Sequence, residues 1–138
     1  MRRVNEEVEL EKGVVTKYRR HVNGGGFVSP KARVDASAHI ASTAYVEQGA
    51  TVARDVFVGA GSWIDRDVML GAQAFVGANV HIGAGSTVGD RARVGSHTRI
   101  GAEVRIAPGV HVDRDIVVRD GAAVREHLRA DGKYGKAA

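Results

Sequence analysis

One aliphatic residue recurs at every sixth position over most of this chain, and no position breaks the pattern. All 17 of these positions hold valine, isoleucine or leucine. In order, they are Val28, Val34, Ile40, Val46, Val52, Val58, Ile64, Leu70, Val76, Ile82, Val88, Val94, Ile100, Ile106, Val112, Val118 and Val124. Two positions before each aliphatic after the first, the residue is small or β-branched. The pattern is a hexapeptide repeat, which indicates stacked coils.

A period of six predicts short strands joined by turns. The aliphatic residue and the residue two before it share one side of an extended strand, which faces the core. Twelve glycines within the repeat stand one or three residues after an aliphatic, where a tight turn can follow. If three hexapeptides close one coil, residues 18 apart stack at the strand spacing of ~4.8 Å. The expected fold is all-β: a single-stranded, triangular, parallel β-helix with about five and a half coils.

The repeat divides the chain into three parts. Residues 1–26 form a charged N-terminal arm, with a possible strand at 14–22 and a glycine hinge before the repeat. Residues 27–124 form the β-helix, and residues 125–138 form a C-terminal cap and tail. We expect a short helix through about Ala130 to cover the open end of the coils.

The stretch IGAGSTVGDRARVGSHTRIGAEVRI, from Ile82 to Ile106, resembles the hexapeptide-repeat proteins of the transferase type. The resemblance extends over the whole repeat and implies a left-handed parallel β-helix, a handedness that the period alone does not give. It also implies a homotrimer, because members of this family are commonly trimers. Many are acyltransferases that use an acyl-CoA or acyl-carrier donor, with a histidine at the subunit interface as general base.

The residue just before each aliphatic points outward, which sorts the surface into three faces. The first face carries Phe27, Tyr45, Trp63, His81 and Arg99. The second face carries Arg33, Thr51, Met69, Thr87 and Arg105. The third face carries His39, Phe57, Phe75, Arg93 and His111. Aromatic rings are therefore concentrated on the first and third faces, which predicts that something covers them.

The corner between the third and first faces is small and uncharged over four coils, unlike the other two corners. A small corner between two aromatic faces is suited to a threefold axis, with the first face of one subunit on the third face of the next. The alternative is a monomer whose rings stack only on one another. The predicted trimer interface consists of Phe27, Tyr45, Trp63, His81, Phe57, Phe75, Ala60, Ala78 and Ser96.

Composition excludes several classes of function. The absence of cysteine excludes disulfides and thiolate metal sites. No apolar run approaches the ~20 residues of a membrane span, and the charged start lacks the apolar core of a signal peptide. We therefore expect a soluble protein made in the cytoplasm without a membrane partner. The net charge is +4, but the arginines are spread around the prism, so nucleic acid is not favoured as a partner.

Two functions fit these features. The main prediction is a non-enzymatic homotrimeric surface, decoration or scaffold module, as in bacterial or phage assemblies, without a cofactor. It would dock on another protein through its arm, at Lys17, Tyr18, Arg19 and Arg20. The alternative is a small O- or N-acyltransferase that uses acyl-CoA. Its candidate base is His97, in the small corner, and no metal site is predicted.

Overall fold

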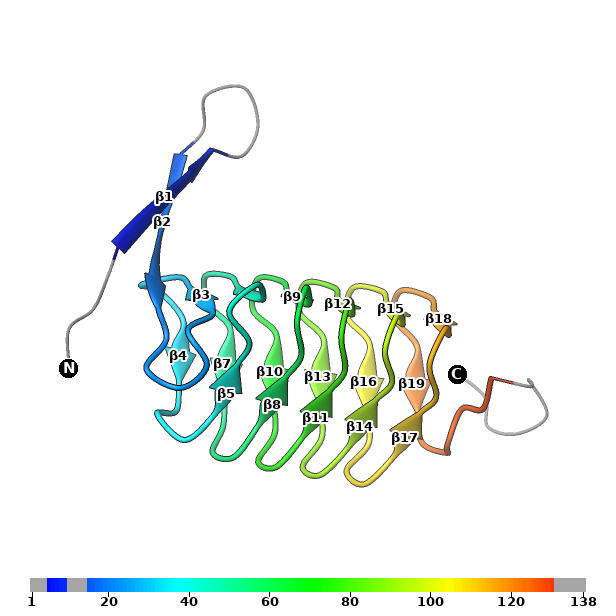
Figure 1. The fold of residues 1–138 in the computed structure, drawn as a ribbon. Coiled ribbons are helices and arrows are strands. Elements are labelled where there is room, and N and C mark those ends of the chain that lie inside the picture. Colours follow the sequence, from blue (N-terminus) through cyan, green and yellow to red (C-terminus); the bar gives the residue numbers. More distant parts are fainter. Residues whose placement is uncertain (1–4, 10–14, 131–138) are drawn as a thin grey trace.

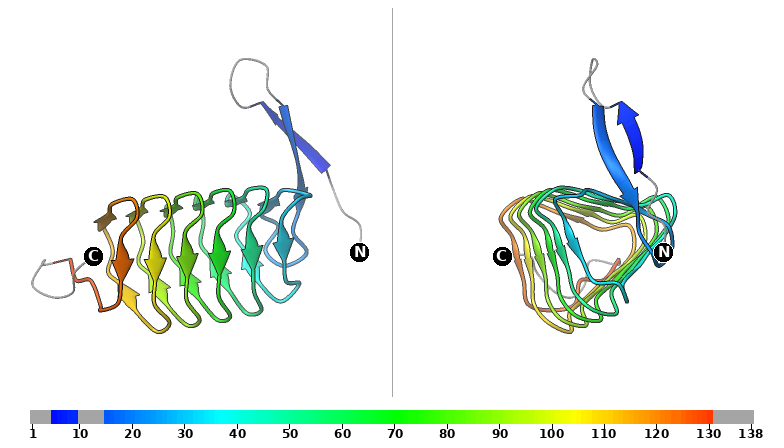
Figure 2. Two further views of the ribbon diagram at one scale, coloured as in Figure 1. Left: turned by 180° about the vertical axis from the view of Figure 1, so that it is seen from behind. Right: turned by 90° about the vertical axis from the view of Figure 1, so that its left-hand side faces the viewer.

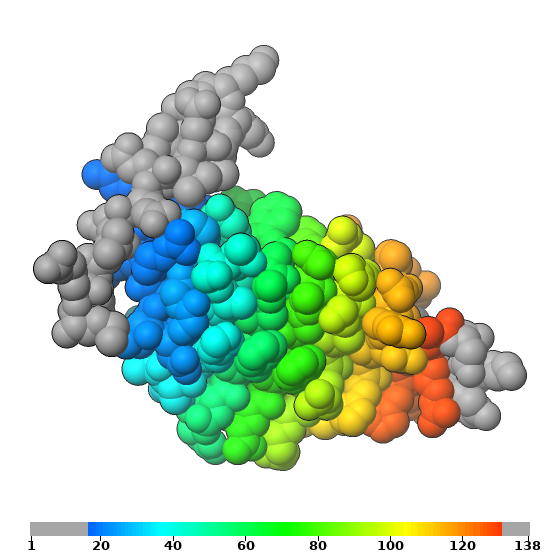
Figure 3. Space-filling model, in the orientation of Figure 1, coloured from blue at the N-terminus to red at the C-terminus, as the bar shows by residue number. Residues whose placement is uncertain are grey.

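Three parallel sheets wrap around one core to form a triangular prism (Figure 1). The computed structural model describes residues 5–9 and 15–130 of the chain. The coils succeed one another along the axis in the order of the sequence, as the colour bands of Figure 3 show. The fold is the expected left-handed parallel β-helix.

Each sheet forms one face of the prism. The first-face sheet contains, in spatial order, β1 (Asn5–Glu9), β2 (Val15–Arg20), β3 (Phe27–Val28), β6 (Tyr45–Val46), β9 (Trp63–Ile64), β12 (His81–Ile82), β15 (Arg99–Ile100) and β18 (Val117–Val118). The second-face sheet contains β4 (Arg33–Val34), β7 (Thr51–Val52), β10 (Met69–Leu70), β13 (Thr87–Val88), β16 (Arg105–Ile106) and β19 (Ala123–Val124). The third-face sheet contains β5 (His39–Ile40), β8 (Phe57–Val58), β11 (Phe75–Val76), β14 (Arg93–Val94) and β17 (His111–Val112).

Residues 18 apart pair in every parallel ladder, so each coil contains three hexapeptides. Tyr45 pairs with Trp63, and Trp63 pairs with His81. Because the register repeats without a shift, like positions stack on like positions along each face. The order of outward side chains predicted for each face is therefore the order along the prism axis.

The core follows the predicted repeat closely. Of the 17 repeat aliphatics, 16 are buried, and Val34 in the first coil is partly buried against the same core. Buried hydroxyls at the small position are hydrogen-bonded between coils: Ser62 donates to the carbonyl of Gly77 at 2.6 Å, and Ser86 donates to that of Gly101 at 2.7 Å. Burial of so many aliphatics, at ~1.5–3 kcal/mol each, is the main stabilising term.

The turns explain both classes of glycine. Every sixth residue from Gly49 to Gly121 has a positive φ, including Gly61 at 71°. Eight of these positions hold other residues, mainly Asp, Asn and long polar side chains, among them His97 at 63°. Gly59, one residue after an aliphatic, has a different role. A Cβ there would lie 2.6 Å from the carbonyl carbon of Gly77, so a side chain would force two coils apart.

At the N-terminal end, β1 and β2 form an antiparallel hairpin that stands away from the prism (Figures 1 and 2). β2 runs antiparallel to β3, with Arg19 opposite Val28, and so covers the N-terminal edge of the first-face sheet. Its Tyr18 is fully buried and makes edge contacts with the rings of Phe27 and Tyr45. The C-terminal part of β2 therefore packs on its own prism.

At the C-terminal end, the expected helical cap is wrong for the described residues, which contain no helix up to Ala130. Leu128 instead makes a parallel bridge with Val112 in β17. Its backbone N–H donates to His111 at 2.9 Å, and its carbonyl accepts from Asp113 at 2.7 Å. The open edge of β17 offers hydrogen-bond partners that a helix of only six residues cannot match. Residues 131–138 of the predicted tail lie outside the described residues.

Candidate active site and comparisons with known proteins

The candidate chemistry of this chain centres on its histidines, since it has no cysteine. On the first face, His81 begins β12 and stacks on Trp63, with the ring centroids 4.2 Å apart and the planes 11° apart. Its Nε2 lies 3.0 Å from Oδ2 of Asp65, one coil earlier. A carboxylate at this distance holds the proton on Nε2 and leaves Nδ1 as a lone pair. The ring is thus fixed in orientation and tautomer.

This pair lines a shallow hollow of about 460 Å³ on the first face. The hollow continues over the next coils past Arg99 to Val117, whose side chain is 78% exposed. Its volume is typical of small-molecule sites. The first face therefore combines an imidazole, an orienting carboxylate, a cation and an apolar patch.

The aspartate of this pair was missed by the sequence analysis, although a signal for it exists. Outward residues contact the residue 16 positions earlier, which follows the aliphatic of the preceding coil. Trp63 Nε1 donates to Glu47 at 2.8 Å by this offset, and His39 lies 3.4 Å from the Asn23 side chain in the same way. Searching for carboxylates 16 residues before each histidine would have found Asp65.

The predicted catalytic residue, His97, lies in the turn that leads from β14 to β15. Its backbone N–H donates to the carbonyl of Ala78 at 2.9 Å, and its side chain is exposed. It is not among the residues that line the first-face hollow. Next to it, Ser96 accepts a hydrogen bond from the backbone of Ala78 at 3.0 Å, while Ala60 is exposed on the same corner. A role for His97 stays a prediction.

The predicted interface rings form two stacks along the axis. On the third face, His39, Phe57 and Phe75 stack at centroid distances of 5.0 and 5.1 Å. On the first face, Phe27 and Tyr45 stack at 4.6 Å. Tyr18 of the arm partly covers the first-face pair, whereas Trp63 on the first face and Phe57 on the third remain 44% and 38% exposed. On both faces, the exposed rings thus follow the first coil.

The predicted docking residues of the arm are largely engaged with the prism itself. The Tyr18 hydroxyl donates to Glu47 at 2.8 Å, and burial together with this hydrogen bond raises the pKa of Tyr18 well above its ordinary value. The guanidinium of Arg20 lies 3.7 Å from the ring centroid of Phe27 and donates to the carbonyl of Ser42 at 2.8 Å. Arg19 is half-buried, and Lys17 is exposed.

No group of three or more metal-binding side chains suited to a metal ion occurs among the described residues. Nor does that part of the chain form any helix that is long and apolar enough to span a membrane.

These features define the chain as a hexapeptide-repeat β-helix protein. The model of the GMPPB C-terminal domain family matches residues 22–121, and the chain belongs to this family. No curated protein sequence matches the chain.

Solved structures with the same fold include acetyltransferases. A perosamine N-acetyltransferase from Caulobacter crescentus, in complex with CoA and GDP-perosamine, has a TM-score of 0.75 and 24% identity. The match covers 80% of this chain and 55% of that one. The acetyltransferase domain of PglB from Neisseria gonorrhoeae FA1090 has a TM-score of 0.53 and 24% identity, and the match covers 81% and 57% of the two chains. The chain thus spans little more than half the length of these structures.

The main functional prediction, a non-enzymatic structural or decoration module, is contradicted by these comparisons. The solved structures named above are acetyltransferases, and those of the perosamine N-acetyltransferase are in complex with CoA. They favour the acyltransferase alternative. The repeat runs from Val28 to Val124 without an inserted loop, and this does not exclude a shallow site on its faces.

Proposed function

We propose that this chain is an acyltransferase that moves an acyl group from acyl-CoA to an amine or hydroxyl, with His81 as general base. The observation that carries the proposal is the contact of 3.0 Å between His81 Nε2 and the Asp65 carboxylate, at the edge of a hollow of about 460 Å³. The fold that it shares with acetyltransferases supports the class of reaction.

The roles follow from the positions of the side chains. Nδ1 of His81 takes the proton of the acceptor as its nitrogen or oxygen attacks the acyl carbon. The bond between that carbon and the donor sulfur breaks, and the thiolate of CoA leaves. Asp65 stabilises the imidazolium that forms, since its carboxylate accepts the Nε2–H in both protonation states. Arg99, on the same hollow, supplies positive charge for an anionic substrate.

We also propose that the active protein is a homotrimer in which the first face of one subunit packs on the third face of the next. The exposed rings of Trp63 and Phe57, on these two faces, support this arrangement. A second subunit would deepen the hollow at His81 into a cleft and exclude water from it. Sedimentation at micromolar concentration should give three chain masses, and Trp63→Glu should reduce that mass. A monomeric wild-type chain would contradict the trimer.

Release of the CoA thiol tests the enzymatic proposal. Acetyl-CoA is mixed with a panel of amino and hydroxy sugars, and the thiol is followed with a colorimetric reagent. We expect His81→Asn to lower kcat about 10²–10⁴-fold, with the KM for acetyl-CoA little changed. Asp65→Asn should lower kcat by about 10–100-fold, because the ring loses its orientation but not its lone pair.

The matched control is His39→Asn, which removes a half-buried histidine from the same repeat position on the third face. It should leave the rate within about twofold. A wild-type chain that releases no thiol with any acceptor would contradict acyl transfer. If His81→Asn keeps the wild-type rate and His97→Ala abolishes it, the general base is His97, the residue predicted from the sequence.

A further inference from the structure

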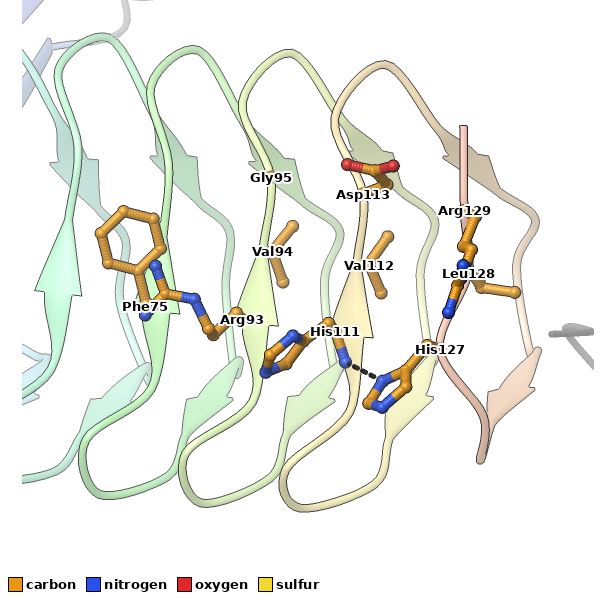
Figure 4. A pocket seen from close by; sticks show the side chains of 10 residues that line it. All are labelled: Phe75, Arg93, Val94, Gly95, His111, Val112, Asp113, His127, Leu128 and Arg129. Atoms are coloured by element: carbon orange, nitrogen blue, oxygen red, sulfur yellow. Dashed lines mark hydrogen bonds between the residues drawn. The ribbon is translucent and has the colours of Figure 1, made fainter. Parts of the chain in front are cut away.

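The row of planar side chains on the third face changes its chemistry along the prism axis. It begins with stacked rings, and at Phe75 the guanidinium of Arg93 lies 4.3 Å from the ring centroid. His111 and His127 continue the row, with ring centroids 4.9 Å apart. Figure 4 shows these four side chains side by side over successive coils. The C-terminal part of the row thus presents N–H groups in place of carbon.

Hydrogen bonds hold His127 in place, although it lies near the end of the described residues. Its neighbour Leu128 is hydrogen-bonded to β17 on both sides, to His111 and Asp113. The backbone N–H of His111 donates to Nδ1 of His127 at 2.9 Å. Since Nδ1 accepts this bond, the ring proton lies on Nε2. His127 therefore presents its Nε2–H as a donor.

Positive charge dominates the groove around these residues. The groove has a volume of about 460 Å³, and its lining includes Arg93, Arg129, both imidazoles and one carboxylate, Asp113. The carboxylate is already engaged: Asp113 accepts hydrogen bonds from the backbone of Arg114 at 3.0 Å and of Ala130 at 3.1 Å. These bonds lower the pKa of Asp113, so that it stays an acceptor that is turned to its own backbone.

We propose that this groove binds the phosphate groups of a small molecule. The guanidinium of Arg93 lies over the Phe75 ring, and its planar set of N–H groups suits two oxygens of one phosphate. The imidazoles of His111 and His127 add donors on the same line, over the next two coils. The volume exceeds that of a single phosphate and accommodates a diphosphate. The inference does not rest on acyl transfer, because within one chain the groove shares no lining residue with the hollow at His81.

Titration of the full chain with pyrophosphate, followed by calorimetry, tests this site. We expect saturable binding of one pyrophosphate per chain, and Arg93→Gln should weaken it at least tenfold. The control is Arg105→Gln, because Arg105 occupies the same repeat position on the second face and is also exposed. It should change the affinity less than twofold. If both variants lose affinity for pyrophosphate equally, binding depends only on the general surface charge, and the proposal is overturned.

A second readout does not depend on any variant. In the wild-type chain, pyrophosphate should shift the ring resonances of His111 and His127 and leave those of His39 and His81 in place. Unchanged resonances at His111 and His127 up to millimolar pyrophosphate would also overturn the proposal.

Two further titrations identify the source of the phosphate. Tighter binding of coenzyme A than of pyrophosphate, lost in Arg93→Gln, would assign the groove to the phosphates of CoA. Tighter binding of a nucleoside diphosphate than of CoA would assign it to a nucleotide. Both results support the phosphate site, and neither requires that the chain catalyse acyl transfer.

Discussion

The two ends of the prism are closed in different ways. At the N-terminal end, the last two residues of β2 pair antiparallel with β3 of the first-face sheet, and Tyr18 is buried against two rings. At the C-terminal end, Leu128 forms a single bridge to the third-face sheet and is 9% exposed. The N-terminal closure thus combines a ladder with an aromatic anchor, whereas the C-terminal closure consists of one aliphatic side chain and its backbone hydrogen bonds.

This difference assigns a larger share of the stability to the N-terminal end and a candidate binding role to the C-terminal end. In a prism of stacked coils each coil contacts only its neighbours, so a closure protects mainly its own end. The N-terminal closure fixes the first coils, on which the first-face stack begins. The lighter C-terminal closure instead positions His127 in the candidate phosphate groove. We therefore expect the larger losses of stability from changes at the N-terminal end.

The largest effect should come from Tyr18→Ala. The change removes a fully buried ring and its hydrogen bond of 2.8 Å to Glu47, and we expect a loss of about 3–5 kcal/mol in the free energy of unfolding. Urea unfolding followed by circular dichroism measures the total loss of free energy of unfolding. Hydrogen exchange should show the loss of amide protection in β2 and β3.

Two controls separate the contributions at Tyr18. Tyr18→Phe keeps the ring and should cost only about 1 kcal/mol, the usual net value of one hydrogen bond. Met69→Ala, on the second face, changes a side chain that is 54% exposed and should cost less than about 0.5 kcal/mol. A Tyr18→Ala chain as stable as Met69→Ala would contradict the role of β2 as a closure.

Replacement of Leu128 by alanine should have a smaller effect. The side chain lies at the end of the core, where the cavity can fill with solvent, so we expect a loss of about 2 kcal/mol. The amide of Asp113, which donates to the carbonyl of Leu128 at 2.7 Å, should exchange faster, while amides in β2 keep their protection. A loss equal to that of Tyr18→Ala would contradict the difference between the ends.

The prism between these ends was predictable because the sequence pattern that specifies it is local and recurs in every hexapeptide. One aliphatic residue every six positions located the core almost completely, and it placed the two-residue strands at the correct positions. The partial burial of Val34 is an end effect, since the first coil has no preceding coil over this sheet. The hexapeptide period says nothing about the closures, which begin where the period stops.

The C-terminal closure shows why the remainder was not predicted. Leu128 follows Val124 by four residues, so it falls off the period and matches the spacing of an amphipathic helix. The structure places it beside Val112 because β17 has a free edge there, which only the three-dimensional arrangement reveals. His127 could not be recognised as part of a groove for the same reason. Asp65, by contrast, lies within the repeat, and its contact with His81 follows from a regular offset.

The two ends should lose their protection from hydrogen exchange at different pH values as the solution is acidified. At the N-terminal end, burial of the His21 ring, whose Nε2 lies 2.8 Å from the carbonyl of Ala38, lowers its pKa below the ordinary value of 6.5. The neutral ring is favoured in the folded state, so its contribution is present above pH 6.5 and is lost as the pH falls through the lowered pKa. At the C-terminal end, hydrogen bonds from Ala130 and Arg114 lower the pKa of Asp113 below 3.8. Its contribution is lost only below pH 3.8.

Hydrogen exchange at pH 7, 5 and 3 can resolve these two windows, after correction for the intrinsic rate at each pH. Protection of amides near His21 should fall first, between pH 7 and 5, while the amide of Leu128 keeps its protection until pH 3. His21→Gln should abolish the first step, because glutamine does not titrate. Asp35, near His21, also has a lowered pKa, so both ends lose protection at pH 3 and only the interval above pH 5 distinguishes them. Simultaneous loosening of both ends in that interval would show that the closures are coupled through the coils, contrary to the nearest-neighbour behaviour expected of a stacked prism.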